Sequence, residues 1–185
     1  MKVLLCLGNV ELIVYKQGGL LMKSLIADRE IAAIIPEYTA QGDFTVLYLR
    51  DGSCERLPVK VETVVRFLSE RRREDIRLLR LWAGEITHAK LWMPLGISWE
   101  LVLVPLKVRV PRVEGDSTIG YFNFTQIEQS YSQDESVASI YLRGGQRIDL
   151  LWTHQTISKH LQNAWLIRAM ITKDLDDALL HRLKI

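Results

Sequence analysis

The sequence has few cysteines and no long apolar run, and these shortages exclude several classes of protein. Its 185 residues include only two cysteines, Cys6 and Cys54, which lie far apart and have no neighbouring metal ligands. Two such residues do not make the disulfide framework of a small secreted domain, so a reducing cytoplasm is expected. No stretch reaches the roughly 20 apolar residues that a membrane-spanning helix needs. We therefore expect a cytoplasmic protein that does not span a membrane.

The N-terminal run MKVLLCLGNVELIVYK also lacks the features of a signal peptide. Gly8 and Glu11 interrupt its apolar residues, and no small-residue cleavage site follows. The alternation of apolar residues over 10–14 predicts a β-strand instead. Because Met22 opens a plausible start of its own, residues 1–21 form, by hypothesis, an upstream extension.

Motifs that would identify an enzyme are missing as well. The sequence contains no phosphate-binding loop, no Rossmann glycine signature and no nucleophile elbow. Its four histidines show neither an HExxH pattern nor zinc-ligand spacing: His88, His154, His160 and His181. A catalytic pair of Cys54 and His88 is conceivable, but a buried or loop cysteine explains Cys54 more simply. We expect no enzyme, no cofactor and no small-molecule substrate.

What the sequence does contain is an uneven distribution of charge. Although the net charge is only +2, residues 66–112 hold ten Lys or Arg against five Asp or Glu. Residues 113–135 hold five acidic residues and no Lys or Arg. A basic middle beside an acidic stretch suits a protein with an anionic partner, and two unrelated solvated surfaces are the alternative.

An internal repeat gives the clearest indication of the fold. VLYLRDG at Val46–Gly52 returns as SIYLRGG at Ser139–Gly145, an offset of 93 residues, and nine of 38 positions are identical between 31–68 and 124–161. The chain is therefore expected to be a single α+β domain, 1–185, with antiparallel sheets. It would hold two similar β-hairpin–helix units, 25–70 and 118–170, related by an approximate internal twofold. The alternative is one mixed α+β domain whose halves merely share propensities.

Each unit is expected to contain a short strand, a hairpin and an amphipathic helix. Asp-Gly and Gly-Gly supply the positive φ that a tight hairpin requires. The predicted return strands are Cys54–Val59 and Arg147–Trp152. The 3.6-residue period that follows predicts two buried helix faces, Val61, Val64, Val65 and Leu68 in one unit and Ile157, Leu161, Ala164 and Trp165 in the other.

The segment between the units is predicted to hold another helix and an edge strand. Ile76, Leu79 and Trp82 share the spacing of one helix face. The strand-like stretch that follows is interrupted by Pro105 and Pro111, and proline does not donate to a β-ladder, so either an edge strand or two short strands are predicted. Alternation along this stretch would place Lys107 and Arg109 on the same face.

The many cations of this middle segment indicate binding to nucleic acid. Guanidinium groups bind phosphate bidentately and suit the narrow minor groove of A/T-rich DNA. The predicted contacts are Arg66, Arg71, Arg72, Arg73, Arg77, Lys107, Arg109 and Arg112. Ion pairs along a helix with the neighbouring Glu70, Glu74 and Asp75 are the alternative explanation.

The order of several short stretches resembles the competence transcription factor family, the ComK-like regulators of Gram-positive bacteria. AIIPEYTAQGDFTVLYLRDG, ITHAK and LVPL resemble that family's first strands, its Thr-His-Lys segment and its Phe-Pro-Thr segment, in the same order. YFNFTQI, IYLRGGQRIDL and QNAWLIR continue the likeness, which covers roughly residues 33 to 170. The family's Gly-Ser-Ser…Gly-Arg stretch is SERRRE here, and the C-terminal residues do not resemble the family's tail.

This resemblance implies a transcriptional regulator that binds paired A/T-rich boxes of double-stranded DNA through the minor groove. It also implies a homo-oligomer, because paired sites favour symmetric assemblies, and it adds Lys90 of ITHAK to the predicted contacts. Replacing Arg71, Arg72 and Arg73 by alanine is expected to abolish binding and to leave folding intact. The alternative function is a non-enzymatic protein-interaction module that uses the acidic stretch 113–135 and the tryptophans.

Overall fold

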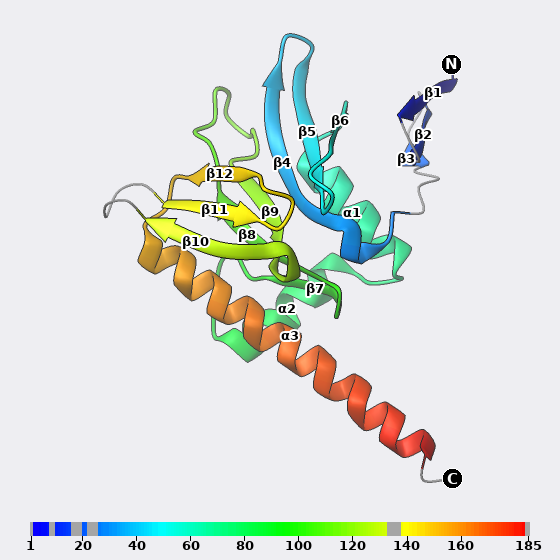
Figure 1. Cartoon of the computed structure of the whole chain (residues 1–185), viewed down its shortest axis with the longest axis vertical. Helices are drawn as coiled ribbons and strands as arrows, with labels where there is room; N and C mark the ends of the chain where they lie inside the picture. Colours follow the sequence, from blue (N-terminus) through cyan, green and yellow to red (C-terminus); the bar gives the residue numbers. More distant parts are fainter. Residues whose placement is uncertain (1, 8–9, 16–19, 22–25, 133–137, 184–185) are drawn as a thin grey trace.

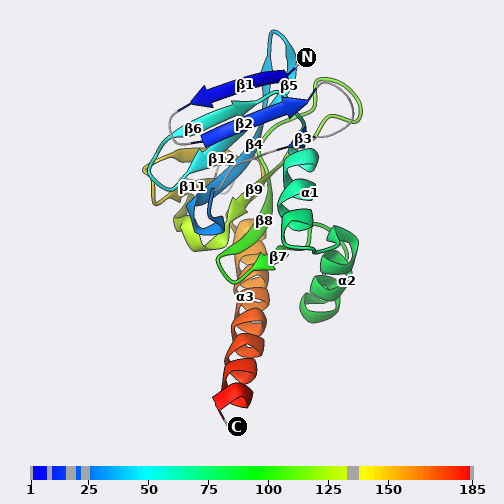
Figure 2. The same cartoon turned by 90° about the vertical axis from the view of Figure 1, so that its right-hand side faces the viewer.

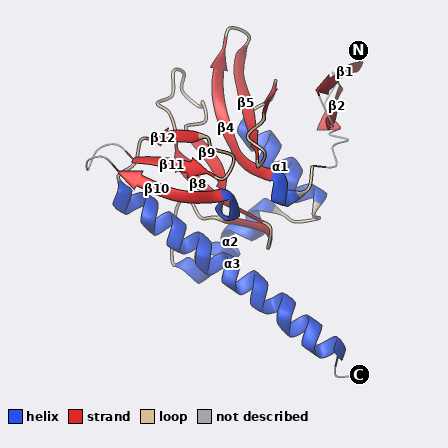
Figure 3. Cartoon of the chain, in the orientation of Figure 1, coloured by secondary structure: helices blue, strands red, loops and turns tan. Residues whose placement is uncertain are grey.

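The computed structural model describes residues 2–7, 10–15, 20–21, 26–132 and 138–183, and this part of the chain is a mixed α+β fold (Figures 1 and 3). Its sheets are antiparallel, and it contains three α-helices. The first strands, β1 (Lys2–Leu7), β2 (Val10–Tyr15) and β3 (Leu20–Leu21), pair with one another in a three-stranded sheet. The strand predicted near residues 10–14 is thus confirmed.

A six-stranded sheet forms the centre of the fold. Its strand order is β6-β5-β4-β9-β8-β7. The strands are β4 (Ile31–Thr39), β5 (Gly42–Leu49), β6 (Cys54–Leu57), β7 (Leu95–Ser98), β8 (Leu101–Lys107) and β9 (Ile119–Asn123). Successive residues of β8 face opposite sides, so Leu101 and Leu103 join one core cluster whereas Val102 and Val104 join the other. The central sheet is therefore covered on both faces.

One face is covered by helices α1 (Val61–Arg71) and α2 (Ile76–Thr87) (Figure 2). The predicted face of α1 is confirmed, because Val61, Val64, Val65 and Leu68 are all buried. On α2, Leu79 is buried, and Ile76 and Trp82 pack against the core. Asp75 caps the N-terminus of α2 by accepting a hydrogen bond from the backbone N–H of Arg77.

The opposite face is covered by a second sheet and a long helix (Figure 2). The sheet has the order β10-β11-β12 and contains β10 (Ile127–Ser132), β11 (Ala138–Leu142) and β12 (Arg147–Leu150). Helix α3 (His154–Leu183) has 30 residues and packs the buried Ile157, Ala164 and Ile167 into this layer.

Two parts of the chain share the same order of elements. The 3-10 helix η1 (Asp28–Glu30) precedes β4, β5, β6 and α1, and η2 (Phe124–Gln126) precedes β10, β11, β12 and α3. Strands β6 and β12, and helices α1 and α3, begin 93 residues apart. Three backbone hydrogen bonds of the first part have a counterpart in the second. The N–H of Leu49 donates to the carbonyl of Ser53, as that of Leu142 does to Gln146. The N–H of Gly52 donates to Leu49, as that of Gly145 does to Leu142, and the N–H of Arg50 donates to Glu30, as that of Arg143 does to Gln126.

The structure corrects two sequence predictions. The strand that contains Pro105 is not at an edge, because β8 lies between β9 and β7. Strand β7 pairs only with Leu101–Leu103, so Pro105 lies past the end of that ladder, where a missing N–H leaves no strand partner unsatisfied. Trp165 of α3 is 62% exposed, because Ile167 and not Trp165 continues the buried stripe.

Candidate nucleic-acid interface

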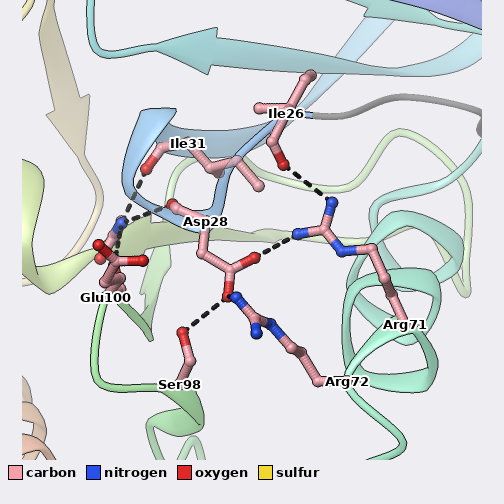
Figure 4. A network of polar contacts seen from close by, with 8 residues as sticks. Ile26, Asp28, Ile31, Arg71, Arg72, Ser98 and Glu100 are labelled. Carbon is pink, nitrogen blue, oxygen red and sulfur yellow. Dashed lines mark hydrogen bonds and ion pairs between the residues drawn. The ribbon is translucent and has the colours of Figure 1, made fainter.

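Two of the predicted DNA-contacting arginines hold a buried carboxylate (Figure 4). The side chain of Asp28 is 0% exposed, and it forms ion pairs with Arg71 and with Arg72, the latter at 2.7 Å. Ser98 Oγ donates a third hydrogen bond to it at 2.7 Å, and Arg71 also donates to the carbonyl of Ile26 at 2.9 Å. A buried charge needs such partners, so both guanidinium groups have a structural role at the end of α1.

The backbone around this carboxylate is fixed by Asn123 of β9, which is itself buried. Its Nδ2 donates to the carbonyl oxygens of Ile31 at 2.9 Å and of Glu100 at 3.0 Å. Together with a longer bond to the carbonyl of Asp28 at 3.5 Å, these bonds connect η1, β4 and the β7–β8 turn, so the site of Asp28 is built from segments that are distant in sequence.

Arg73 points elsewhere, because the chain turns sharply after α1. The N–H of Glu74 donates to the carbonyl of Ser69 and the N–H of Arg73 to that of Glu70, which is the hydrogen bonding of a Schellman motif. Arg73 has φ 61° at the position where glycine is usual. An arginine held in the left-handed region at such a position is a reason to test that side chain for function.

Arg66, Arg73 and Arg77 line one hollow at the α1–α2 junction, of about 570 Å³. Three acidic residues, Glu70, Glu74 and Asp75, line the same hollow. Arg77 pairs with Asp75 at 3.1 Å and Arg66 lies 3.9 Å from Glu70, both at exposed positions where ion pairs contribute little. The structure therefore brings three predicted contacts together, with balancing carboxylates between them.

Arg109 and Arg112 lie near the tip of the β4–β5 hairpin and do not belong to the lining of the α1–α2 hollow. Arg109 pairs with Asp43 at 2.7 Å, and the two side chains are only 11% and 10% exposed. The guanidinium carbons of Arg109 and Arg112 lie over the ring of Tyr38, 3.8 Å and 4.5 Å from its centroid. Tyr38 also donates to Asp116 at 2.7 Å, which lowers the pKa of that carboxyl. Arg109 thus fastens the 108–118 loop to the hairpin.

The two predicted lysines occupy further places. Lys90 is exposed in the loop between α2 and β7, and Lys107 is half-buried at the end of β8. The nine predicted contacts consequently do not form one cationic surface. Arg71, Arg72 and Arg109 are committed to ion pairs with little-exposed aspartates, and Arg66, Arg73 and Arg77 share the α1–α2 hollow.

The structure also brings into contact two turns that each carry an arginine omitted from the list of predicted contacts. The turn between β5 and β6 abuts the turn between β11 and β12: a Cβ added to Gly144 would lie 2.8 Å from the backbone N of Gly52. Arg50 and Arg143 occupy equivalent places in these turns, and both are exposed. The Nε of Arg143 donates to the carbonyl of Thr125 at 3.1 Å. In the described part of the chain, neither guanidinium forms an ion pair. The sequence signal was available, because both arginines belong to the repeated YLR-x-G.

Within the described ranges, no three His, Cys, Asp or Glu side chains are grouped to hold a metal ion. Among the helices of these ranges, none combines the length and the apolar character needed to cross a membrane.

No protein-family model, no curated protein and no solved structure matches this chain.

Proposed function

We propose that this protein is a DNA-binding transcriptional regulator of the competence transcription factor type, which binds A/T-rich double-stranded DNA. The observation that carries the proposal is the pair of exposed arginines, Arg50 and Arg143, on two turns that touch each other. Arginines inserted into a narrow minor groove are a common means of reading A/T-rich DNA. The ordered sequence likeness over residues 33 to 170 supports the same function.

We further propose that the two hairpin–helix units are equivalent halves related by an approximate twofold. The recurring hydrogen bonds at Leu49 and Leu142, and the equal offset of the following helices, support this relation. A twofold that passes between the abutting turns would present Arg50 and Arg143 symmetrically, which suits the pseudo-dyad of a duplex.

Arg66, Arg73 and Arg77 form the second candidate contact surface, since these are the predicted contacts that the α1–α2 hollow gathers. The expectation that alanine at Arg71 and Arg72 leaves folding intact is withdrawn, because these substitutions would leave Asp28 buried without its partners. Both residues are therefore left out of the mutational test. For Arg73 the suitable replacement is glycine, which accepts the left-handed backbone.

The test is an electrophoretic shift with A/T-rich and G/C-rich duplexes at two salt concentrations. The wild-type protein is expected to prefer the A/T-rich duplex and to bind more weakly at the higher salt concentration. Each phosphate contact that is lost should reduce the salt slope by about 0.9. The R50A/R143A variant is expected to bind at least about tenfold more weakly. R66A/R73G/R77A measures the contribution of the hollow in the same assay.

Arg56→Ala is the matched control, because Arg56 is an exposed arginine of β6 in an ion pair with Glu37, and it belongs neither to the two turns nor to the lining of the hollow. Wild-type binding that neither multiple variant weakens would place the DNA contacts on another surface. A wild-type protein that shifts neither duplex at the lower salt concentration would contradict the regulator function itself.

A protein-interaction module is the second candidate function, and a specific observation favours it. Large apolar side chains are exposed on two helices, among them Leu78 and Leu81 of α2, each 64% exposed, and Trp165 of α3. Pull-down of a protein partner together with no DNA binding would favour this function over the regulator.

A further inference from the structure

A hollow of about 810 Å³ lies between the loop that follows α2 and the first turns of α3. The loop contributes residues 88–91, and α3 contributes side chains between Gln155 and Asn163. Sites that hold small molecules have volumes of roughly 300–1,000 Å³. The lining includes neither the arginines of the abutting turns nor those of the α1–α2 hollow, so this is a separate candidate site.

The charge of this hollow is unbalanced. Lys90 of the loop and Lys159 of the helix line it, and none of its described lining residues is acidic. By contrast, the α1–α2 hollow contains three carboxylates beside three arginines, and a third hollow, at residues 165–177, contains two carboxylates beside two cations. Among the described residues, neither Lys90 nor Lys159 forms an ion pair. A concave surface with cations of one sign attracts anions.

Side chains that donate hydrogen bonds complete the lining. They include the amides of Gln155, Gln162 and Asn163 and the hydroxyl of Ser158. In the described part of the chain, none of these four side chains has a hydrogen-bond partner. Amide, hydroxyl and ammonium groups all donate to the oxygens of an anion, and the ammonium bonds are the stronger ones.

The loop that carries Lys90 is held in a defined conformation. His88 and Trp92, on either side of Lys90, have φ 53° and 55°, in the left-handed region that is uncommon for residues other than glycine. The ring of Trp92 lies 6.5 Å from that of Trp152, which stacks on His160 in the wall of the hollow. Strained backbone of this kind clusters at ligand sites, and a loop that is already fixed lowers the entropy cost of binding.

We propose that this hollow binds a phosphate-bearing anion through Lys90 and Lys159. A phosphate dianion matches the two ammonium groups in charge, and its remaining oxygens accept hydrogen bonds from the side-chain amides of α3. A small phosphorylated molecule and the backbone of a DNA duplex both carry this group, and they predict different results when a duplex is added. The inference does not depend on the proposed DNA binding, because a free phosphate compound would occupy the hollow equally well.

The test is a titration of the isotope-labelled full chain with inorganic pyrophosphate at constant ionic strength, followed by the NMR shifts of the backbone amides. Saturable shifts are expected in residues 88–91 and 155–163, with a Kd below about 1 mM. K90Q/K159Q should weaken binding at least about tenfold, because it removes both charges from the hollow. K60Q/K173Q is the matched control, since it removes two exposed lysines outside the lining, and it should bind like wild type. All four lysines are exposed, so both variants should keep the far-UV circular dichroism of the wild type.

An A/T-rich duplex, titrated into the same labelled chain, identifies the source of the phosphate. If the duplex shifts the amides of the hollow and K90Q/K159Q reduces its affinity, the DNA backbone supplies the phosphate. If the duplex leaves these amides unmoved while pyrophosphate shifts them, the ligand is a small phosphorylated molecule. Either result supports the site. Pyrophosphate that shifts none of these amides at about 10 mM would overturn the proposal, and so would equal affinity of wild type and K90Q/K159Q for pyrophosphate.

Discussion

Asp28 shows how a single side chain decides the role of its neighbours. Arg71 and Arg72, which the sequence predicts as phosphate contacts, form ion pairs with this one buried carboxylate, 43 and 44 residues away along the chain. Their separation from Asp28 explains why no local pattern could assign them. The adjacent Arg73 does not join this pairing, because its backbone is in the left-handed region and the chain turns there.

We expect R71A/R72A to destabilise the fold by about 2–4 kcal/mol, somewhat less than for a completely buried ion pair because Arg71 and Arg72 are 26% and 46% exposed. The cause is the uncompensated charge of Asp28. Urea unfolding followed by circular dichroism measures the effect. R56A, which removes an exposed ion pair with Glu37, should leave the unfolding midpoint nearly unchanged. An unchanged midpoint for R71A/R72A would mean that water satisfies Asp28.

His160 is the second residue whose surroundings make a prediction. Its ring stacks on Trp152 at 4.8 Å between centroids, and its Nδ1 is buried without a hydrogen-bond partner in the described structure. Burial lowers the pKa of His160, Lys159 lowers it further, and a hydrogen bond to the backbone of Trp92 opposes them. The folded protein therefore resists protonation of this ring.

Because the folded pKa lies below the ordinary value of 6.5, the contribution of His160 to stability is complete above about pH 6.5. It is lost as the pH falls from there through the folded pKa. His160→Phe keeps the stacking and does not titrate. The free energy of unfolding, measured in urea at pH 7, 6 and 5, should fall more steeply for wild type than for H160F. Parallel curves would show that protonation of His160 does not oppose folding.

Among the elements, the abutting turns of the two hairpins are the contact on which the proposed twofold depends. Gly52 has φ +92°, and a Cβ on it would lie 2.9 Å from the carbonyl oxygen of Gly144. Gly145 has φ +84°, and a Cβ there would meet no atom within 4 Å. The two glycines therefore share backbone strain and differ in crowding.

Gly145→Ala should cost about 1–2 kcal/mol, the penalty of the left-handed backbone alone. Gly52→Ala should cost about 2–4 kcal/mol, because the two turns must also move apart. Thermal and urea unfolding of both variants provide the comparison. If the two substitutions destabilise equally, the turns are not in contact in solution.

The elements also show which parts of the fold can be read from the sequence. The hairpin turns and the buried face of α1 depend on local chemistry, namely Asp-Gly, Gly-Gly and the 3.6-residue period, and they were predicted. Pro105 is compatible with a strand inside the sheet because β7 pairs only with Leu101–Leu103 and does not reach it. The length of β7 is not revealed by any property of Pro105. The candidate site shares this division, because the repeat contained Arg50 and Arg143, whereas the pairing of Arg109 with Asp43 required tertiary structure.

At the scale of the whole chain, the six-stranded sheet, the β10–β12 sheet and the three helices share their core clusters, whereas the described strands β1, β2 and β3 pair only with one another. This separation bears on the hypothesis that residues 1–21 are an upstream extension and that Met22 is a start of its own. Cooperative unfolding should then arise from residues after Met22.

A chain that begins at Met22 is therefore expected to unfold in a single transition, with a midpoint temperature within about 2 °C of the full chain, which corresponds to less than about 1 kcal/mol at this size. Its near-UV circular dichroism should be retained, since all five tryptophans lie after residue 81. Differential scanning calorimetry of both chains makes the comparison. A midpoint lowered by more than about 5 °C would show that β1–β3 stabilise the central sheet and belong to the folding unit.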